Sequence, residues 1–151
     1  MKRRFPMLTI FTLAGGLLTA PVLAGAADQV RTRVAGFRQL GAAYKAVADG
    51  LRSNDLARVR AASGQIGGAS RTIYSWFPRG SGPRPGVKTA ARAEIWSRAG
   101  DFRTAADAFT RQAQAFQRVA AGGDLNAIKA ESRKLGATCK GCHDNFRVAS
   151  D

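Results

Sequence analysis

The sequence lacks the alternation of apolar and polar residues that is typical of half-buried β-strands. No stretch keeps a period of two for long enough to indicate a sheet. Internal repeats and low-complexity tracts are missing as well. These absences argue against a βαβ architecture and leave an all-helical fold as the expectation.

Acidic residues are also scarce. The 151 residues include 10 Asp and Glu against 24 Lys and Arg, a formal net charge of +14. A basic surface can bind nucleic acid, anionic lipid or an acidic protein. The positive residues are spread through every segment, and aromatic residues do not interleave with them in a binding pattern, so we expect no nucleic-acid binding. We interpret the charge mainly as a solvated surface, with steering of anionic partners as the alternative.

Histidine and cysteine are rare, with one and two residues respectively, and all three fall in one stretch where residues 139–143 read Cys-Lys-Gly-Cys-His. Two thiols separated by two residues and followed by a histidine form the attachment signature of a c-type haem. Each thiol adds to one haem vinyl group, and the histidine reaches the iron from the same side. On a helix, Cys139, Cys142 and His143 stand at i, i+3 and i+4 and share one face.

Two other interpretations of the cysteine pair remain open. In an exported protein the pair can form a disulfide, and Cys-x-x-Cys can be the redox motif of a haemless thiol oxidoreductase. A redox motif of that kind normally opens a helix after a strand in a βαβ setting, which this sequence does not suggest. Because the only histidine stands where an iron ligand is required, we predict one covalently bound haem c with His143 as the iron ligand.

The first residues have the pattern of a secretory signal peptide. Residues 2–4 are Lys-Arg-Arg, residues 7–18 are almost wholly apolar, and residues 21–26 offer small side chains at A-x-A-like spacing. A spanning helix needs roughly 20 apolar residues. We therefore expect residues 1–24 to be removed, with cleavage between residues 24 and 27, and a single domain of residues 25–151 in the periplasm. Loss of three basic residues lowers the formal charge from +14 to +11.

Four segments carry apolar residues at helical spacing. They cover residues 28–51, 56–77, about 97–121 and 125–148. One face of the first segment carries Val30, Val34, Phe37, Leu40, Tyr44, Val47 and Leu51, and one face of the third carries Phe102, Ala106, Phe109, Ala113, Phe116 and Ala120. Residues 50–55 form a break that contains N-cap candidates, and the prolines and glycines of residues 78–87 exclude regular structure there. Gly122-Gly123 ends the third segment, and Asp124 can cap the fourth. The linker between the first two segments is short, so we expect the first two helices to be antiparallel neighbours. Four helical segments of this length predict a four-helix bundle.

Two glycines, Gly36 and Gly41, lie inside the first helical segment. Each costs about 1 kcal/mol relative to alanine in a helix interior. Their presence predicts that a backbone or a flat cofactor approaches the helix closely at these points.

The sequence resembles the cytochrome c′ family, the class II c-type cytochromes, over the whole chain that follows the signal peptide. The resemblance is carried by the run Cys-Lys-Gly-Cys-His-Asp-Asn-Phe-Arg at residues 139–147, by residues 94–97, by the turn at residues 77–81 and by Phe37-Arg38-Gln39. The position of the attachment motif supports it, because class I cytochromes carry this motif near the N-terminus.

The resemblance implies an up-down-up-down bundle, often a homodimer built through its first two helices, with the haem between helices. It implies that Arg38 and Gln39 lie against the haem and its propionates. Arg147, four residues after the ligand histidine, matches a basic residue of the family.

One position departs from the family pattern. Relatives usually place a large apolar residue on the distal face of the haem four residues after the first-helix arginine, and here that position is Ala42. The alignment therefore predicts an open distal pocket, with Phe37, Leu40, Ala42 and Phe77 as candidate wall residues. A one-turn slip would instead bring Leu40 or Tyr44 nearest the pocket.

The supply of axial ligands limits the chemistry of the iron. Met and a second His usually fill the sixth position in electron carriers, but Met1 and Met7 lie in the signal peptide and His143 is the only histidine. We therefore predict a five-coordinate, largely high-spin iron in a protein that is not an enzyme. It would bind small gases such as nitric oxide or carbon monoxide and take part in one-electron transfer. The alternative is a dedicated electron carrier for an acidic partner.

Overall fold

The computed structural model describes residues 20–149 of the chain, and every regular element in that range is a helix. The long helices are α1 (Ala20–Ser53), α2 (Leu56–Ser70), α4 (Ala99–Gly122) and α5 (Leu125–Phe146). A short 3₁₀ helix, η1 (Ile73–Trp76), follows α2, and a single turn, α3 (Glu94–Ser97), precedes α4. The fold is the expected all-α, up-down-up-down four-helix bundle.

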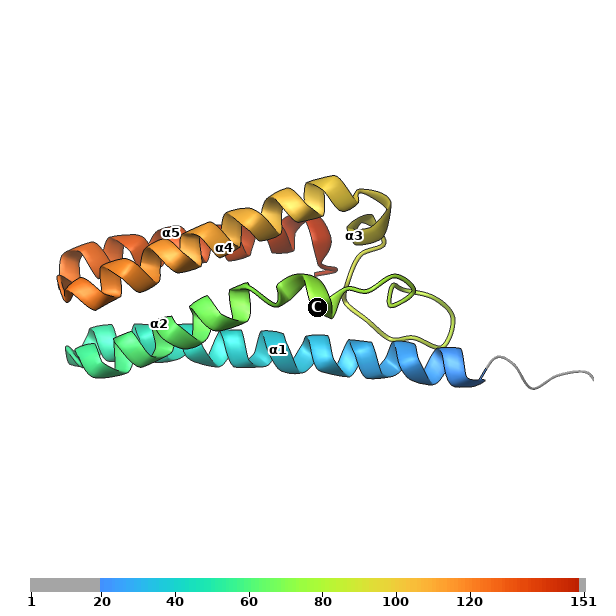
Figure 1. Cartoon of the computed structure of the whole chain (residues 1–151), viewed down its shortest axis with the longest axis horizontal. Helices are drawn as coiled ribbons and strands as arrows, with labels where there is room; N and C mark the ends of the chain where they lie inside the picture. The colour runs from blue at the N-terminus through green and yellow to red at the C-terminus, as the bar shows by residue number, and fades with distance from the viewer. Residues whose placement is uncertain (1–19, 150–151) are drawn as a thin grey trace, which may run out of the picture.

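The helices form two antiparallel pairs, α1 with α2 and α4 with α5 (Figure 1). The pairs join because α2 packs against α4, whereas the neighbouring helices α1 and α5 make few contacts. The opposite seam of the bundle, between α1 and α5, is therefore the more open one. None of the helices that the structure describes is long and apolar enough to span a membrane.

The helix ends follow from their capping residues. The Asp55 carboxylate accepts a hydrogen bond from the backbone N–H of Arg58 at 2.9 Å and starts α2. Asp124 accepts bonds from the N–H groups of Asn126 and Ala127 and starts α5, as expected. Gly123 has a left-handed φ of 84°, a conformation that favours glycine, and it ends α4.

Two helix boundaries lie far from the sequence expectation, and the others differ from it slightly. Helix α1 begins at Ala20 instead of Asp28, so the expected cleavage sites fall within its first turns, while residues 1–19 of the proposed signal peptide lie outside the described residues. Helix α2 ends at Ser70 instead of continuing to Phe77. There the hydroxyls of Ser70 and Thr72 donate to carbonyls three residues back, which competes with the helical ladder.

The apolar core is built from one stripe on each helix. On α4 the buried residues are Phe102, Ala106, Phe109, Ala113, Phe116 and Ala120, the six that the spacing predicts. Val59 and Ile66 of α2, Val47 of α1, and Ile128 and Leu135 of α5 complete the centre. Val34 of α1 departs from the expectation, because 41% of its surface is exposed.

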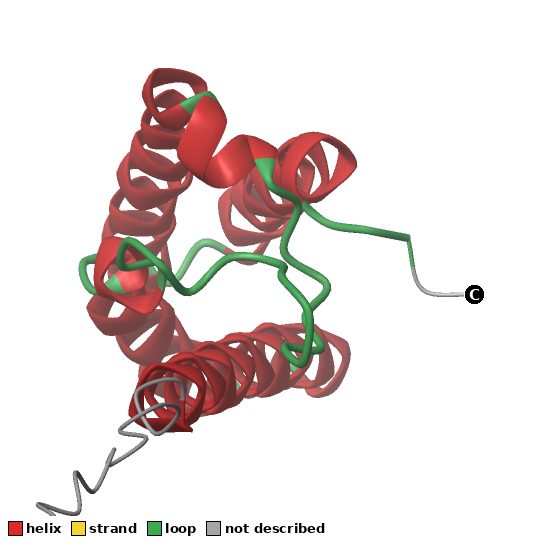
Figure 2. Ribbon diagram, turned by 90° about the vertical axis from the view of Figure 1, so that its right-hand side faces the viewer, coloured by secondary structure: helices red, strands yellow, loops and turns green. Residues whose placement is uncertain are grey.

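The segment between η1 and α3 is irregular and is fixed at both ends. Near its start, the indole Nε1 of Trp96 donates to the carbonyl of Pro78 at 3.0 Å. Near its end, the N–H of Arg92 donates to Phe146 O at 3.0 Å, and the N–H of Val148 donates to Ala90 O at 2.8 Å. Figure 2 shows this loop crossing the end of the bundle between the helices. Residues 89–91 are thereby held beside the end of α5.

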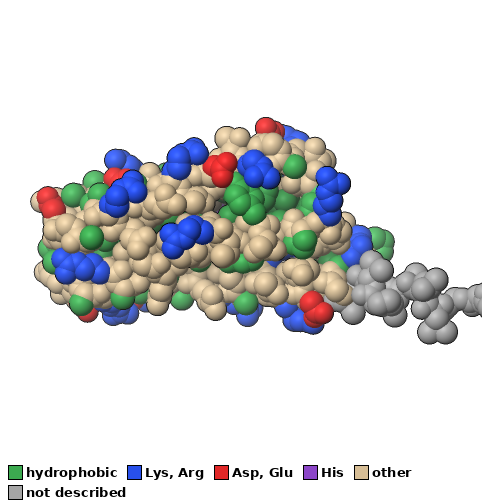
Figure 3. All heavy atoms as spheres, viewed as in Figure 1, with side chains coloured by type: hydrophobic (Ala, Val, Ile, Leu, Met, Phe, Trp, Pro, Cys, Tyr) green, Lys and Arg blue, Asp and Glu red, His purple; other side chains and the backbone are tan. Residues whose placement is uncertain are grey.

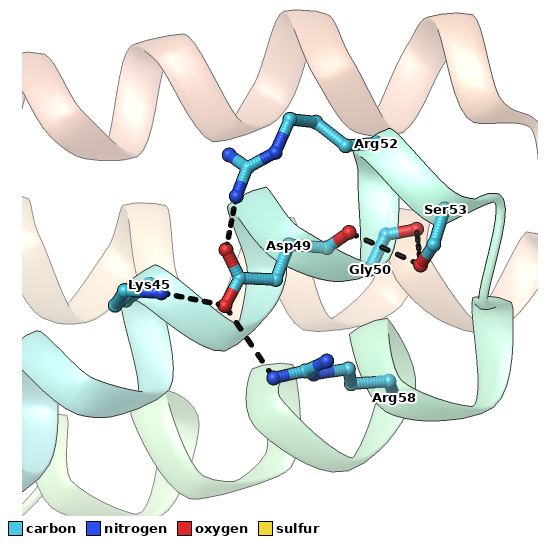
Figure 4. Close-up of polar contacts among 6 residues, drawn as sticks. All are labelled: Lys45, Asp49, Gly50, Arg52, Ser53 and Arg58. Carbon is cyan, nitrogen blue, oxygen red and sulfur yellow. Dashed lines mark hydrogen bonds and ion pairs between the residues drawn. The ribbon is translucent and has the colours of Figure 1, made fainter.

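Asp49 links the end of α1 to the start of α2 (Figure 4). Its carboxylate pairs with Lys45 at 2.8 Å, with Arg52, and across the junction with Arg58 at 3.4 Å. The hydrogen bond from Lys45 lowers the pKa of Asp49, and the positive charges of Lys45 and Arg52 add to the effect.

A close approach is present at Gly36, but the approaching group is the side chain of Trp76 rather than a backbone, and at Gly41 a Cβ atom would meet nothing within 4 Å among the described residues. A Cβ atom at Gly36 would lie 2.6 Å from the ring carbon Cζ2 of Trp76, a buried indole. Gly36→Ala should therefore lower the free energy of unfolding by about 1–3 kcal/mol. Gly68→Ala on α2, where a Cβ meets nothing within 4 Å, should raise it by about 0.5–1 kcal/mol. Chemical denaturation measures both, and equal effects of the two substitutions would contradict this packing.

The Asp49 cluster predicts a pH-dependent contribution to stability. Because the folded pKa is depressed, the contribution is present above the unfolded value of about 3.9 and is lost as the pH falls through the folded pKa. Asp49→Asn should lower the melting temperature at pH 7, and the gap from wild type should close at acid pH. Thermal unfolding between pH 7 and pH 2.5 measures this, and a gap that stays constant would refute it.

Candidate haem site

The attachment motif lies within α5, in its last turns. Because the helix continues through the motif, Cys139, Cys142 and His143 share a face, as the spacing predicts. Both cysteines are free and half-buried. All three side chains line one cavity of about 610 Å³, a size typical of a small-molecule site.

The cavity lies between α1 and α5, where the two helices make few contacts. The loop that precedes α3 closes it at one end. Exposed residues Val34, Arg38 and Gly41 mark its mouth along α1. Its deeper walls are mostly apolar, with contributions from Phe37, Leu40, Ile66, Ile73, Phe77, Ile95, Phe102, Phe109, Leu135 and Phe146. A flat apolar group attached to α5 would contact α1 and α4 from this position.

Aromatic rings surround the histidine side of the cavity. The Phe37 ring lies 6.2 Å from the His143 ring, 5.1 Å from the Trp76 ring and 6.1 Å from the Phe77 ring, each in an edge-to-face arrangement. Phe77 in turn packs against Phe102 at 4.9 Å. These contacts connect α1 to η1 and α4, so the wall facing His143 is a continuous aromatic cluster.

Partial burial shifts the pKa values of the motif side chains toward their uncharged forms. It raises the pKa of Cys142 to about 11, with a smaller effect from Cys139, and it raises the pKa of Cys139 as well. Burial, followed by the positive charge of Arg147, lowers the pKa of His143. A neutral imidazole is the form that offers a nitrogen lone pair to a metal.

The cavity lining is strongly unbalanced in charge. It includes Arg33, Arg38 and Arg147 but no Asp or Glu among the described residues. Arg33 is buried, with 4% of its surface exposed, whereas Arg38 and Arg147 are exposed. A group bound here meets three arginine side chains and no carboxylate of residues 20–149.

The other predicted site residues have different outcomes. Phe37, Leu40 and Phe77 line the cavity, as do Arg38 and Arg147, whereas Gln39 is exposed and is not part of the lining. The expectation for Ala42 was wrong, because Ala42 is exposed and lies outside the cavity.

The helical period explains the error at Ala42. Successive residues are about 100° apart around a helix, so Ala42 points about 200° away from Leu40. The residues of α1 that face the cavity here are Leu40, Gly41 and Tyr44. The one-turn alternative, with Leu40 or Tyr44 at the pocket, agrees with the structure.

Sequence reasoning missed three polar lining residues, Arg33, Thr89 and Thr138. Arg33 could have been found, because it lies four residues before Phe37 and so interrupts the apolar stripe of the first helix with a cation. Thr89 lies in an irregular loop, where no periodicity reports which side chains face inward.

The residues present fit a covalently attached haem. Two thiols and a neutral imidazole share one wall, the remaining surface suits a large apolar ring system, and the unpaired positive lining suits propionate groups. The described residues contain no cluster of three His, Cys, Asp or Glu that could hold a separate metal ion.

Comparison with known proteins gives consistent results. A family model described as cytochrome c′ matches residues 28–147. A cytochrome c′ from Rubrivivax gelatinosus is 38% identical over 45% of this chain, and the match spans about half of that relative, 53% of its length. A cytochrome c′ from Allochromatium vinosum is 29% identical over 90% of this chain and 92% of its own length.

Solved structures of similar proteins share the fold. A cytochrome c′ described as having ligand-controlled dimer dissociation superposes with a TM-score of 0.77 at 26% identity, covering 89% of this chain and all of the other. A nitric oxide complex of a cytochrome c prime variant from Alcaligenes xylosoxidans gives a TM-score of 0.75 at 25% identity. It covers 83% of this chain and 97% of its own.

Proposed function

This chain belongs to the cytochrome c′ family, whose members carry a covalent haem c, and we propose that it is a periplasmic protein that binds nitric oxide or carbon monoxide at a five-coordinate iron. Cys139 and Cys142 form the two thioether bonds, and His143 is the axial ligand. When bound, the haem supplies an iron that can take up a small gas or an electron.

One observation carries the proposal: the cavity offers a single strong iron ligand. Its lining includes His143 but no Met, no Lys and no second His within the described part of the chain. Tyr44 is the remaining candidate, and its hydroxyl donates to the carbonyl of Ser132 at 3.0 Å. The sixth position is thus left to water or to an incoming gas. The nitric oxide complex of the Alcaligenes relative supports the choice of ligand.

Export and assembly belong to the same proposal. The basic and apolar pattern of residues 1–24 supports a cleaved signal peptide, and haem attachment through thiols suits a compartment outside the reducing cytosol. We infer a homodimer formed through the outer faces of α1 and α2. The relative with ligand-controlled dimer dissociation supports this assembly.

Electron transfer to an acidic partner is the second candidate function. The formal charge after loss of residues 1–24 is +11, and Lys and Arg side chains outnumber acidic ones on the face shown in Figure 3. Such a field accelerates encounter with an acidic protein, and salt weakens it. Rates of electron exchange that fall steeply with ionic strength would favour this function over gas binding alone.

The attachment residues make a direct prediction. Cys139→Ala and Cys142→Ala should each leave one thioether or block maturation, because each sulfur makes one of the two covalent links. Lys140→Ala, inside the motif but with an exposed side chain, should behave as wild type. Pyridine haemochrome spectra of the purified proteins measure the difference, and wild-type spectra for both cysteine variants would refute the assignment.

Gas binding makes the next prediction. The ferrous protein should take up carbon monoxide and nitric oxide with a shift of the Soret band, because no protein ligand has to leave. Tyr44→Phe should keep the wild-type ferric and carbonyl spectra while lowering the free energy of unfolding by about 1 kcal/mol, the worth of one hydrogen bond. A Soret band insensitive to both gases would exclude the open site, and an altered ferric spectrum in Tyr44→Phe would make Tyr44 a ligand.

A further inference from the structure

Arg33 is a buried cation on α1 whose hydrogen bonding is incomplete. Its Nη2 donates to the carbonyl of Ser81 at 3.0 Å and lies 3.4 Å from the hydroxyl of Thr89. Its Nη1 is buried and has no hydrogen-bond partner among the described residues. The guanidinium carbon lies 4.8 Å from the centre of the Phe77 ring and 5.7 Å from that of Trp96.

This arrangement leaves the charge without an anion. None of the ion pairs within residues 20–149 includes Arg33. Two neutral oxygen acceptors and two aromatic faces offset only part of the cost of removing a guanidinium from water, because buried charges are normally paired with an opposite charge. The fold therefore holds a preformed donor whose natural partner is a carboxylate.

The position of Arg33 shows where that carboxylate would come from. Arg33 lines the haem cavity, and no Asp or Glu of the described residues does. Its partners Ser81 and Thr89 belong to the loop that closes the end of the cavity. A haem seated against Cys139, Cys142 and His143 brings two propionates into this lining.

We propose that Arg33 binds one haem propionate through Nη1 and keeps its contacts with Ser81 and Thr89. The proposal rests on the haem occupying the cavity as proposed above. It adds a residue to the pair implied by the family resemblance, Arg38 and Gln39. Both of those are exposed, and solvent weakens the attraction of an exposed charge for a carboxylate.

A purely structural role makes a different prediction. If Arg33 only anchors the loop through Ser81 and the rings of Phe77 and Trp96, its replacement changes stability but leaves the propionates as they are. If Arg33 binds a propionate, its replacement changes the vibrations of that carboxylate. It also lowers the midpoint potential, because a positive charge near the iron favours the reduced state.

The test compares Arg33→Gln and Arg33→Lys with Arg31→Gln. Arg31 is on the same helix, its side chain is 72% exposed, and its removal takes away the same charge. The holoproteins are produced with aminolevulinate that is isotope-labelled at the carboxyl carbon, which marks both propionates for infrared spectroscopy. We expect one labelled carboxylate band to shift in both Arg33 variants and not in Arg31→Gln. The midpoint potential should fall in the order wild type, Arg33→Lys, Arg33→Gln.

Unshifted propionate bands in both Arg33 variants would overturn the proposal, even if the variants were less stable. If Arg33→Gln does not yield a protein with attached haem, Arg33→Lys alone tests the proposal. An ammonium group in place of a guanidinium must still shift the infrared band of a propionate bound to it. A wild-type protein without a haemochrome spectrum would instead refute the proposed function, so the two failures are distinguishable.

Discussion

The site depends on one geometric constraint, namely that α5 remains helical through residues 139–143. This continuity places two thiols and an imidazole on one face, where a single rigid group can bond to all three. The same face points into the seam between α1 and α5, which make few contacts with each other. The seam stays open because α2 and α4 make the main contacts between the two helix pairs. The loop before α3 closes one end of the cavity through backbone hydrogen bonds to Phe146 and Val148.

The cavity wall combines rigidity with an unbalanced charge. The edge-to-face contacts among Phe37, Trp76 and Phe77 hold the wall opposite His143 in place and tie it to the backbone at Gly36. Within the described part of the chain the positive lining has no carboxylate to neutralise it, which suits a cofactor that carries propionates. Among residues 20–149 the apolar wall contains no Met and no second His. This favours the proposed uptake of a neutral diatomic gas, because such a ligand would have favoured electron shuttling.

Much of this could be predicted from the sequence, for physical reasons that differ among elements. The buried stripe of α4 was predicted residue by residue because every third or fourth position is apolar. Asp124 and Gly123 were predicted as helix-capping residues because caps and left-handed turns have strong residue preferences.

Other features could not be predicted from local patterns. The predicted end of α2 was wrong because hydrogen bonds from the hydroxyls of Ser70 and Thr72 to nearby carbonyls override the apolar period. The prediction for Ala42 was wrong because alignment spacing does not fix helix rotation. The position of Arg33 in the apolar stripe could have indicated that it faces inward, but its partners Ser81 and Phe77 are distant in the sequence and could not be predicted.

The central claim is that His143 is the only strong protein ligand to the iron of a haem fixed by Cys139 and Cys142. Electron paramagnetic resonance of the purified ferric protein at neutral pH tests this directly, because the spin state reports the number of strong axial ligands. The structure predicts a high-spin signal with near-axial symmetry. A rhombic low-spin signal from the whole sample would show a second strong ligand and contradict the account.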